Sequence, residues 1–499
     1  MAHSWARHLP EGTDPTSVDL LRERSLPAAW AARWSEAPDA VVLVGDGTEV
    51  RAGELDTRTR TVAGRLAAAG LRPGDRVLMS ASPSVDLVVA HVAALRLGLV
   101  VVPVNGGYRE REVAHIVTDS EPAAAVVDEP ERGEWIRAAS DRPVTVVSSA
   151  VELPDGDPGQ FGLSLDASAP DDLALLVYTS GTTGAPKGAM LTHGNILASA
   201  EAVRIAWRWT ASDRLVLALP LFHMHGLGVG VHGTLLSGAS AVLVPRFTPD
   251  AVLDAARDHH ATLFFGVPTM YSRLAASARI GELGALRLCV SGSAPLAPEL
   301  HERFASEGVS VLERYGMTET VMNVSNPYDG ERRPGTVGFP LPGVELRLED
   351  DAEEGQILLR GPNVFPGYWR REAATRDAFD ADGWFRTGDV GRVDADGYLR
   401  IVGRAKELII TGGYNVYPRE VEDVLLEHPG VAEVAVIGVP SEEWGETVVA
   451  VVVAHGDLDL DDLLAHAGDR LASFKQPREV RVVDALPRNA LGKILRHEL

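Results

Sequence analysis

Cysteine is nearly absent from this sequence, which has 499 residues and a single cysteine, Cys289. One thiol cannot form an internal disulfide framework, so the fold fits a reducing interior. The N-terminal residues lack the apolar core of a secretory signal. The most apolar run, 87–104, is interrupted by His91 and Arg96, which favours a buried helix and strand over a membrane span. We therefore expect a cytoplasmic protein with no stable membrane association.

Basic residues are also scarce, with 47 Lys and Arg against 70 Asp and Glu and a net charge of −23. Such a surface repels nucleic acid, so an anionic ligand needs a local binding site. At 45% hydrophobic residues the chain can bury large cores, and its length exceeds what one core usually supports. Two or more domains are expected, and the sequence sets no oligomeric state.

Apolar strand-like runs alternate with helix-like stretches from about residue 40 to residue 312, after an N-terminal part expected to be irregular. Continuous Val, Ala and Leu runs indicate parallel sheets covered by helices. From about Glu354 short strands and glycine turns predominate, and past Arg404 a smaller unit begins. The predicted fold class is α/β: a large N-terminal region of layered, mostly parallel sheets, a β-rich portion, and a small α+β unit.

A run of small, hydroxylated and glycine residues at 178–190 stands out. It reads Tyr178-Thr-Ser-Gly-Thr-Thr-Gly-Ala-Pro-Lys-Gly-Ala-Met190 and lies between an apolar run and a helix expected from Thr192. Exposed backbone N–H groups, hydroxyls and the Lys187 ammonium suit an anion such as phosphate. The spacing differs from a Walker A loop, because Gly188 stands where a magnesium-binding Ser or Thr is required. We predict a phosphate cradle that serves a different nucleotide chemistry.

A second polar stretch, Arg314-Tyr-Gly-Met-Thr-Glu-Thr320, directly follows a strand expected at 309–312. Open parallel sheets bind ligands at the ends of their strands. Glu319 is a hard oxygen ligand suited to Mg²⁺, Thr318 can bond a phosphate oxygen, and Tyr315 offers a flat face to a base. At another strand end, the small residues of Ser291-Gly-Ser-Ala-Pro295 permit close approach to a planar ring.

Three segments of the last part of the chain place charged groups in turns. Thr387-Gly-Asp389 offers a carboxylate to the two hydroxyls of a ribose, and Gly403-Arg404 offers a guanidinium where the large and small regions meet. Lys493 follows a glycine turn close to the C-terminus. A lysine so close to the C-terminus is normally a solvated surface charge. The other motifs of this chain indicate a functional role for Lys493 instead.

Taken together, these motifs resemble the adenylate-forming enzymes, which include acyl-CoA synthetases, luciferases and nonribosomal adenylation domains. The resemblance extends from about residue 40 onward and is most specific at 178–190 and 314–320. It implies that a carboxylate attacks the α-phosphate of Mg-ATP to give an acyl-adenylate and pyrophosphate, and that a thiol then displaces AMP. The implied cofactors and partners are Mg²⁺, ATP, coenzyme A and a small-molecule carboxylic acid.

The resemblance assigns a role to each matching residue. Glu319 and Thr318 would lie at the metal and the phosphates, and Lys187 at the β,γ-phosphates. Lys493 would bridge the carboxylate oxygen and the α-phosphate, where its charge is worth most in the transition state. The other nucleotide residues are Thr179, Ser180, Gly181, Thr182 and Thr183 at the phosphates, Ser293, Ala294, Tyr315 and Gly316 at the adenine, Asp389 at the ribose, and Arg404 at ribose or phosphate.

The resemblance also implies that a small domain rotates between the two half-reactions. It divides the chain into a large domain 1–403, a hinge 404–406 and a lid 407–499, with Lys406 at the hinge position. Rotation would withdraw Lys493 and bring a glycine-rich wall of a pantetheine tunnel against the active site. That wall comprises Gly412, Gly413 and Tyr414, with Arg419, Lys475 and Arg478 as cations for the phosphates of coenzyme A.

Within the superfamily, residues 320–336 and Pro220-Leu-Phe-His-Met-His-Gly226 look like those of malonyl-CoA synthetases. A dicarboxylate brings a second charge into the acyl pocket, and burying that charge without a partner costs several kcal/mol. Arg287 is the preferred partner, since its planar fork can hold a carboxylate bidentately. The alternative is that Arg287 contacts the adenylate or stabilises the fold and does not bind the substrate acid. Further pocket candidates are His225, Ser291, Met322 and Asn323.

The leading hypothesis is thus an ATP-dependent acid–CoA ligase acting on malonate or methylmalonate. One alternative is a ligase of the same mechanism acting on a medium-chain fatty or aromatic acid. A second alternative is an acyl-AMP ligase that loads an acyl-carrier protein, since a glycine-rich tunnel also admits a carrier's phosphopantetheine arm.

Overall fold

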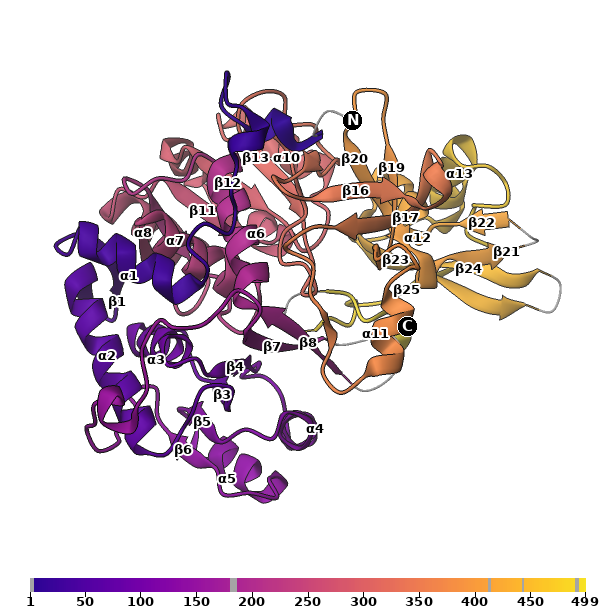
Figure 1. Ribbon diagram of the computed structural model, residues 1–499. Helices are drawn as coiled ribbons and strands as arrows, with labels where there is room; N and C mark the ends of the chain where they lie inside the picture. Colours follow the sequence, from indigo (N-terminus) through magenta and orange to yellow (C-terminus); the bar gives the residue numbers. More distant parts are fainter. Residues whose placement is uncertain (1–3, 180–185, 412–413, 442–443, 490–492) are drawn as a thin grey trace. The chain divides into compact units, whose positions relative to one another are not determined.

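The computed structural model describes residues 4–179, 186–411, 414–441, 444–489 and 493–499 (Figure 1). The chain divides into two compact units. The first unit comprises 1–345 and 359–385, and the second comprises 346–358 and 386–499. Each unit is therefore built from two separate stretches of chain, and strands β17 (Glu354–Arg360) and β19 (Phe385–Val393) cross the division. The hinge at 404–406 stays a prediction.

The first unit contains a nine-stranded sheet with a parallel centre. Its strand order is β15-β14-β13-β12-β11-β9-β10-β1-β2, with antiparallel pairing only at the two edges. The strands are β1 (Val41–Gly45), β2 (Thr48–Arg51), β9 (Arg214–Leu217), β10 (Ser240–Leu243), β11 (Leu263–Gly266), β12 (Leu288–Ser291), β13 (Val311–Tyr315), β14 (Val324–Ser325) and β15 (Phe339–Pro340).

A seven-stranded sheet in the same unit has the order β18-β8-β7-β4-β3-β5-β6. Strands β7, β4, β3, β5 and β6 run parallel, as the apolar runs predict, and β8 and β18 add an antiparallel edge. The strands are β3 (Arg76–Ser80), β4 (Val100–Pro103), β5 (Ala124–Val127), β6 (Thr145–Val147), β7 (Leu173–Thr179), β8 (Lys187–Thr192) and β18 (Gly367–Tyr368).

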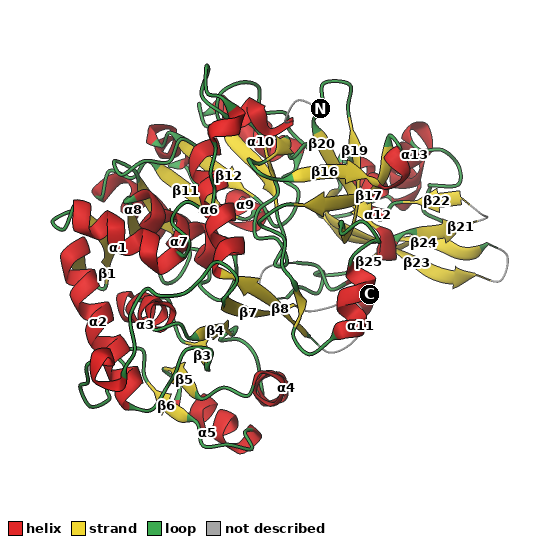
Figure 2. Ribbon diagram, in the orientation of Figure 1, coloured by secondary structure: helices red, strands yellow, loops and turns green. Residues whose placement is uncertain are grey.

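Helices flank these two sheets, as the red ribbons of Figure 2 show. The predicted apolar stretch 87–104 forms a buried helix followed by a buried strand, as expected. The helices are α1 (Leu26–Glu36), α2 (Ala52–Ala68), α3 (Val85–Arg96), α4 (Glu110–Ser120), α5 (Pro130–Ala139), α6 (His193–Ala206), α7 (His232–Ser237), α8 (Pro249–Asp258), α9 (Pro268–Ala275), α10 (Pro298–Ser306) and α11 (Glu372–Ala378), with a π-helical turn η4 (His225–Val231) before α7.

One local expectation was wrong, and one strand was not predicted. The N-terminal part is not irregular throughout, because α1 begins after Ser25, whose hydroxyl accepts from the amide of Ala28, and it buries Trp30 and Trp34. The helix expected from Thr192 is confirmed as α6, which Thr192 caps through a reciprocal bond with Asn195. Strand β8, which precedes α6 and overlaps the end of the 178–190 run, was not predicted.

The second unit is α+β. One sheet has the order β16-β17-β19-β20, and the other has the order β22-β21-β24-β23, with β25 pairing β24. Helices α12 and α13 contribute Val421, Leu425 and Leu463 to a core shared with the latter sheet. The elements are β16 (Glu345–Leu348), β20 (Leu399–Arg404), β21 (Ile409–Thr411), β22 (Tyr414–Val416), β23 (Val431–Ser441), β24 (Gly445–Ala454), β25 (Glu479–Val482), α12 (Pro418–Leu426) and α13 (Leu460–Arg470). Among the described residues, no helix combines the length and apolarity that crossing a bilayer requires.

Two buried histidines of the first unit share a hydrogen bond. The Nε2 atoms of His91 and His232 lie 2.8 Å apart, and the two rings stack. Burial lowers the pKa of His91 to about 3. Burial, followed by the proximity of His91, lowers the pKa of His232 well below its usual value. The folded pair is therefore neutral, whereas unfolded histidine binds a proton below pH ~6.5.

Because the unfolded state binds these protons and the folded state does not, stability should fall as the pH drops from 7.5 to 5. The expected slope is about 1.4 kcal/mol per pH unit for each buried histidine, once the pH is below ~6.5. The variant His91→Leu should lose less stability over this range than the wild type, which urea unfolding at several pH values would measure. Parallel pH profiles for the two proteins would contradict this prediction.

Candidate active site

Strands β7 and β8 flank the predicted phosphate cradle. They pair antiparallel up to Thr179 opposite Lys187, and the Thr179 hydroxyl donates to the Lys187 carbonyl at 3.4 Å. Ser180, Gly181, Thr182 and Thr183 lie outside the described residues. The cradle therefore connects two strands of one sheet, whose pairing fixes its two ends.

Helix α4 holds both ends of the cradle. On one side, the Tyr178 hydroxyl donates to Asp119 at 2.7 Å, and burial together with Asp119 raises the pKa of Tyr178. On the other side, Nε2 of His115 lies 2.9 Å from the carbonyl oxygen of Pro186, where it can donate. The two anchors set the separation of the strands that enter and leave the cradle.

Glu319 lies close to the cradle through Tyr368 of β18. The Tyr368 hydroxyl donates to Oε1 of Glu319 at 2.9 Å, and the Lys187 ammonium lies 5.2 Å from the centre of the Tyr368 ring. Glu319 is buried at 7% exposure, and Thr318 beside it is half-buried. The structure thus brings together a cation, a carboxylate and a hydroxyl that sequence motifs 130 residues apart were predicted to supply.

The two segments predicted to bind adenine follow neighbouring parallel strands, β12 and β13. Ser293 and Ala294 are exposed, and Ser293 has a φ of 75°, a costly conformation that concentrates at functional sites. Tyr315 is half-buried at the end of β13. Gly316 packs so closely that a Cβ there would lie 2.2 Å from the carbonyl oxygen of Val321.

A group of buried polar atoms without partners lies at the same strand ends. Nε and Nη2 of Arg314, both ring nitrogens of His225 and the Ser291 hydroxyl have no hydrogen-bond partner within the described chain. A Cβ on Gly292 would lie 2.4 Å from Nε of Arg314, which places the guanidinium against the segment that carries Ser291. His225 stacks on Phe265 of β11, and burial, followed by the charge of Arg314, lowers its pKa well below the usual range.

Arg314 is the residue of this group that the sequence reasoning missed. It is 5% exposed, and burial lowers its pKa to about 9, so it is still charged at neutral pH. A buried charge without a partner within the described chain is costly, which makes Arg314 a candidate for binding an anion. The available signal was a basic residue at the end of an apolar strand, inside a motif already singled out. Met322, 1% exposed, and Asn323, whose Nδ2 lacks a partner, follow nearby.

Arg287, the preferred candidate from sequence, is engaged elsewhere. Its Nε and Nη2 donate to the two carboxylate oxygens of Asp213, each at 2.6 Å, and its other bonds go to the carbonyls of Trp207 and Arg208. Burial alone would lower the pKa of Arg287, but the bonds to Asp213 raise it. With its fork already filled by Asp213, Arg287 holds the fold together and has no free face for a substrate carboxylate.

The second unit carries the residues predicted for ribose and for the reacting carboxylate. Asp389 and Arg404 are directly opposite each other on β19 and β20, and Nε of Arg404 donates to Asp389 at 3.1 Å. Lys493 is exposed by surface area, yet surrounding atoms desolvate it enough to lower its pKa, and Arg404 lowers that pKa further. Asp389 and Glu407 act in the opposite direction.

The predicted hinge and tunnel residues also belong to the second unit. Lys406 lies in a short 3-10 turn, Ala405–Glu407, after β20. Tyr414 begins β22, whereas Gly412 and Gly413 lie outside the described residues. The proposed cations for coenzyme A have partners: Lys475 pairs with Glu420, Arg419 pairs with Asp423, and Arg478 lies over the ring of Trp444.

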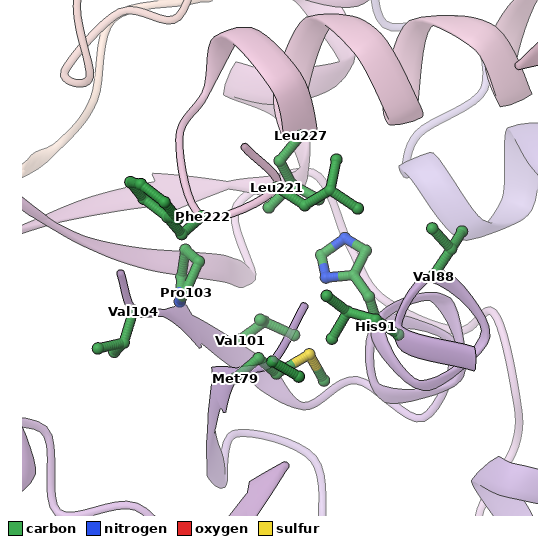
Figure 3. Close-up of a pocket in the computed structure, with 11 residues that line it drawn as sticks. Met79, Val88, His91, Val101, Pro103, Val104, Leu221, Phe222 and Leu227 are labelled. Atoms are coloured by element: carbon green, nitrogen blue, oxygen red, sulfur yellow. The ribbon is translucent and has the colours of Figure 1, made fainter. Parts of the chain in front are cut away.

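An apolar pocket with an empty volume of about 360 Å³, part of it open to solvent, lies within the first unit. Its wall is formed by the ends of β3 and β4, by α3 and by the segment that leads into η4 (Figure 3). Met79, Pro103, Phe222 and Leu227 are among the lining residues, and the imidazole of His91 contributes the polar edge.

Comparison with known proteins identifies the family. Residues 30–369 match the AMP-binding enzyme family, and residues 420–493 match the AMP-binding enzyme C-terminal domain. The chain therefore belongs to the AMP-binding enzymes, and the predicted superfamily and fold class are confirmed.

The relatives bear the names of CoA ligases and synthases for different acids. A feruloyl-CoA synthase of Amycolatopsis sp is 39% identical, over 96% of this chain and 99% of that protein. A malonate–CoA ligase of Arabidopsis thaliana is 35% identical, over 86% of this chain and 78% of that protein. The crystal structure of ATP-bound MatB from Rhodopseudomonas palustris is 40% identical, with a TM-score of 0.87, and the match covers 95% of this chain and 98% of that one. This protein is an AMP-forming acyl-CoA ligase that uses ATP and coenzyme A.

We expect Arg287→Ala to destabilise the fold rather than to change the choice of acid. Removing one partner of a buried pair leaves Asp213, 3% exposed, as an uncompensated charge and costs about 3 kcal/mol. Urea unfolding measures this loss. Arg257→Ala, which breaks only the exposed contacts with Asp254 and Asp258, serves as the matched control and should leave stability unchanged. A stable Arg287→Ala protein with altered acid preference would contradict this role.

Proposed function

We propose that the enzyme activates a short dicarboxylic acid, with malonate or methylmalonate as the leading substrate, and transfers it to coenzyme A. The observation that carries this proposal is the buried, unpartnered guanidinium of Arg314. A distal carboxylate would accept from Nε and Nη2 of Arg314 and from the Ser291 hydroxyl, all of which otherwise lack partners. His225, neutral because its pKa is lowered, adds a donor without adding charge.

The position of Ser291 and Arg314 beside the segments proposed for adenine favours a short acid. Ser291 is the last residue of β12 and Arg314 the last but one of the neighbouring strand β13, and both precede the segments proposed for adenine, Ser293-Ala294 and Tyr315-Gly316. The reacting carboxylate must lie beside the nucleotide, so a carboxylate held at Arg314 belongs to the far end of a small molecule. The relative named malonate–CoA ligase supports this assignment.

The first half-reaction is assigned to groups in both units. Lys187 and the cradle bind the β,γ-phosphates, Asp389 and Arg404 bind the ribose, and Lys493 neutralises the charge that builds on the α-phosphate as the carboxylate oxygen attacks. An anion bound near Lys493 opposes the desolvation and the charge of Arg404, which lower the pKa of this lysine, and so favours its charged form. In the second half-reaction the thiol of coenzyme A attacks the acyl carbon and AMP leaves.

Mg²⁺ fits the residues present. Within the described chain no cluster of three or more His, Cys, Asp or Glu side chains could hold a metal alone. This is the arrangement that Mg²⁺ adopts beside phosphates, where one or two carboxylates and the phosphate oxygens share the ion. Glu319 is the proposed carboxylate ligand, and Thr318 adds a hydroxyl. The ion would supply charge neutralisation for the departing pyrophosphate.

An aromatic acid is the second candidate substrate. The apolar pocket beside η4 offers an apolar wall to an aromatic ring, and a relative bears the name feruloyl-CoA synthase. This reading leaves the Arg314 charge without a partner when substrate binds, and we therefore rank it below the dicarboxylate.

A panel of acids, assayed by pyrophosphate release, separates the two candidates. Malonate and methylmalonate should give the highest kcat/KM, and butyrate and benzoate the lowest. In Arg314→Leu, kcat/KM for malonate should fall by about 100-fold or more because the distal carboxylate loses its charged partner, while butyrate should change little. Equal losses for malonate and butyrate, or a wild-type maximum at ferulate, would contradict the proposal.

The same variant has a second expected result, which concerns stability. Leucine removes a buried charge that has no partner in the free enzyme, so the melting temperature of Arg314→Leu should equal or exceed that of the wild type. Thermal melts with and without malonate test this. Malonate should stabilise only the wild type.

Lys493→Ala should separate the two half-reactions. Adenylation should fall by two to three decades, about 3–4 kcal/mol, because a charge at the transition state is lost. Thioester formation from supplied acyl-AMP should survive, since that step does not use the ammonium. Hydroxamate trapping measures the first step, and equal loss of both steps would refute the assignment.

A further inference from the structure

We infer that Tyr368 is a positioning residue that orients Glu319 for the metal–nucleotide complex and supports Lys187 of the cradle. The inference rests on the proposed assignment of Glu319 to Mg²⁺ and adds a residue to that site. Its basis is the double contact of one side chain: the Tyr368 hydroxyl donates to Glu319 at 2.9 Å, and its ring faces the Lys187 ammonium at 5.2 Å.

The hydroxyl contact fixes the carboxylate. The phenol hydroxyl carries the only proton of this contact, so Tyr368 donates and the carboxylate of Glu319 accepts, at 2.9 Å. A hydrogen bond to a carboxylate is stronger than one between neutral groups. One oxygen of Glu319, Oε1, is thereby held in a set direction, which reduces the reorganisation needed when a cation binds.

The ring contact fixes the cation. An ammonium over an aromatic face is attracted by the ring quadrupole, and the attraction grows as the pair is desolvated. Without nucleotide, Lys187 and Glu319 carry opposite charges near the same ring, and Tyr368 keeps each in its place from a single rigid side chain.

The backbone around Tyr368 is held by the elements that form the cradle. Tyr368 pairs with Ala189 of β8, and the Trp369 amide donates to the Gly188 carbonyl at 2.8 Å. The Trp369 indole donates to the carbonyl of Asp119, whose carboxylate accepts from Tyr178 at the other end of the cradle. Phe365, three residues before Tyr368, donates its amide to the Glu319 carbonyl at 2.9 Å. Residues 365–369 therefore connect Glu319, the proposed metal ligand, to the strands that hold the cradle.

Two variants separate the two contacts. Tyr368→Phe keeps the ring and removes the hydroxyl, so affinity for MgATP should fall about tenfold while affinity for ATP in EDTA is unchanged. Tyr368→Leu removes the ring as well and should weaken both forms of the nucleotide. Isothermal titration without any acid measures these affinities independently of turnover.

Tyr271→Phe is the matched control, because it removes a buried tyrosine hydroxyl that donates to the Val290 carbonyl at 3.0 Å in the core. It should lower the melting temperature without changing the ratio of MgATP to ATP affinity. If Tyr368→Phe behaves like Tyr271→Phe, the residue is only structural and the inference is overturned.

Glu319→Gln distinguishes this inference from the function on which it rests. It should abolish the advantage of MgATP over ATP, and adding Tyr368→Phe should then have little further effect. If Glu319→Gln keeps the Mg²⁺ advantage, the metal assignment and the inference both fall. If Glu319→Gln loses it and Tyr368→Phe keeps it, the metal assignment stands and the inference alone falls.

Discussion

The candidate site depends on one constraint: the charged guanidinium of Arg314 is buried without a hydrogen-bond partner within the described chain. Arg314 is the last but one residue of β13, the strand that ends at Tyr315 and leads to Glu319, so the cost of its burial lies beside the residues proposed for the nucleotide. The fold limits that cost by keeping nearby His225 neutral, so that no second positive charge is added. A ligand that brings a negative charge recovers what folding leaves unsatisfied, and an uncharged acyl tail does not.

Much of the fold could be predicted from the sequence, because continuous apolar strands alternate with helices and leave few other arrangements. Helix α1 was missed since its signals, the Ser25 cap and the spacing of Trp30 and Trp34, lie in a part of the chain rich in charged residues. Strand β8 was missed for a different reason. A strand of the sequence Lys-Gly-Ala-Met-Leu-Thr has little pattern of its own and forms because β7 pairs with it.

The sequence alone does not decide whether Arg287 or Arg314 is available to bind a substrate carboxylate. Both residues adjoin buried strands next to motifs of small or polar residues, and their chemistry is identical. What separates them is Asp213, a residue 74 positions before Arg287 that fills its fork from two sides. No comparable carboxylate reaches Arg314 within the described chain. Only the tertiary structure decides which guanidinium is occupied, whereas the roles of Thr318 and Glu319, which come from a local motif, stay predictions.

Each of the two units carries its own set of the charged residues proposed for the reaction. The first unit places Lys187 and Glu319 in contact with one side chain, Tyr368, so the residues proposed for the phosphates and the metal are held together within that unit. The second unit pairs Asp389 with Arg404 and leaves Lys493 with a lowered pKa. Desolvation and Arg404 both oppose the charge of Lys493, and an arriving anion reverses that balance. Because the attraction between an ammonium and a ligand grows as negative charge accumulates on the ligand, the role that we propose for Lys493 would favour the transition state over the bound substrates, which is the condition for catalysis.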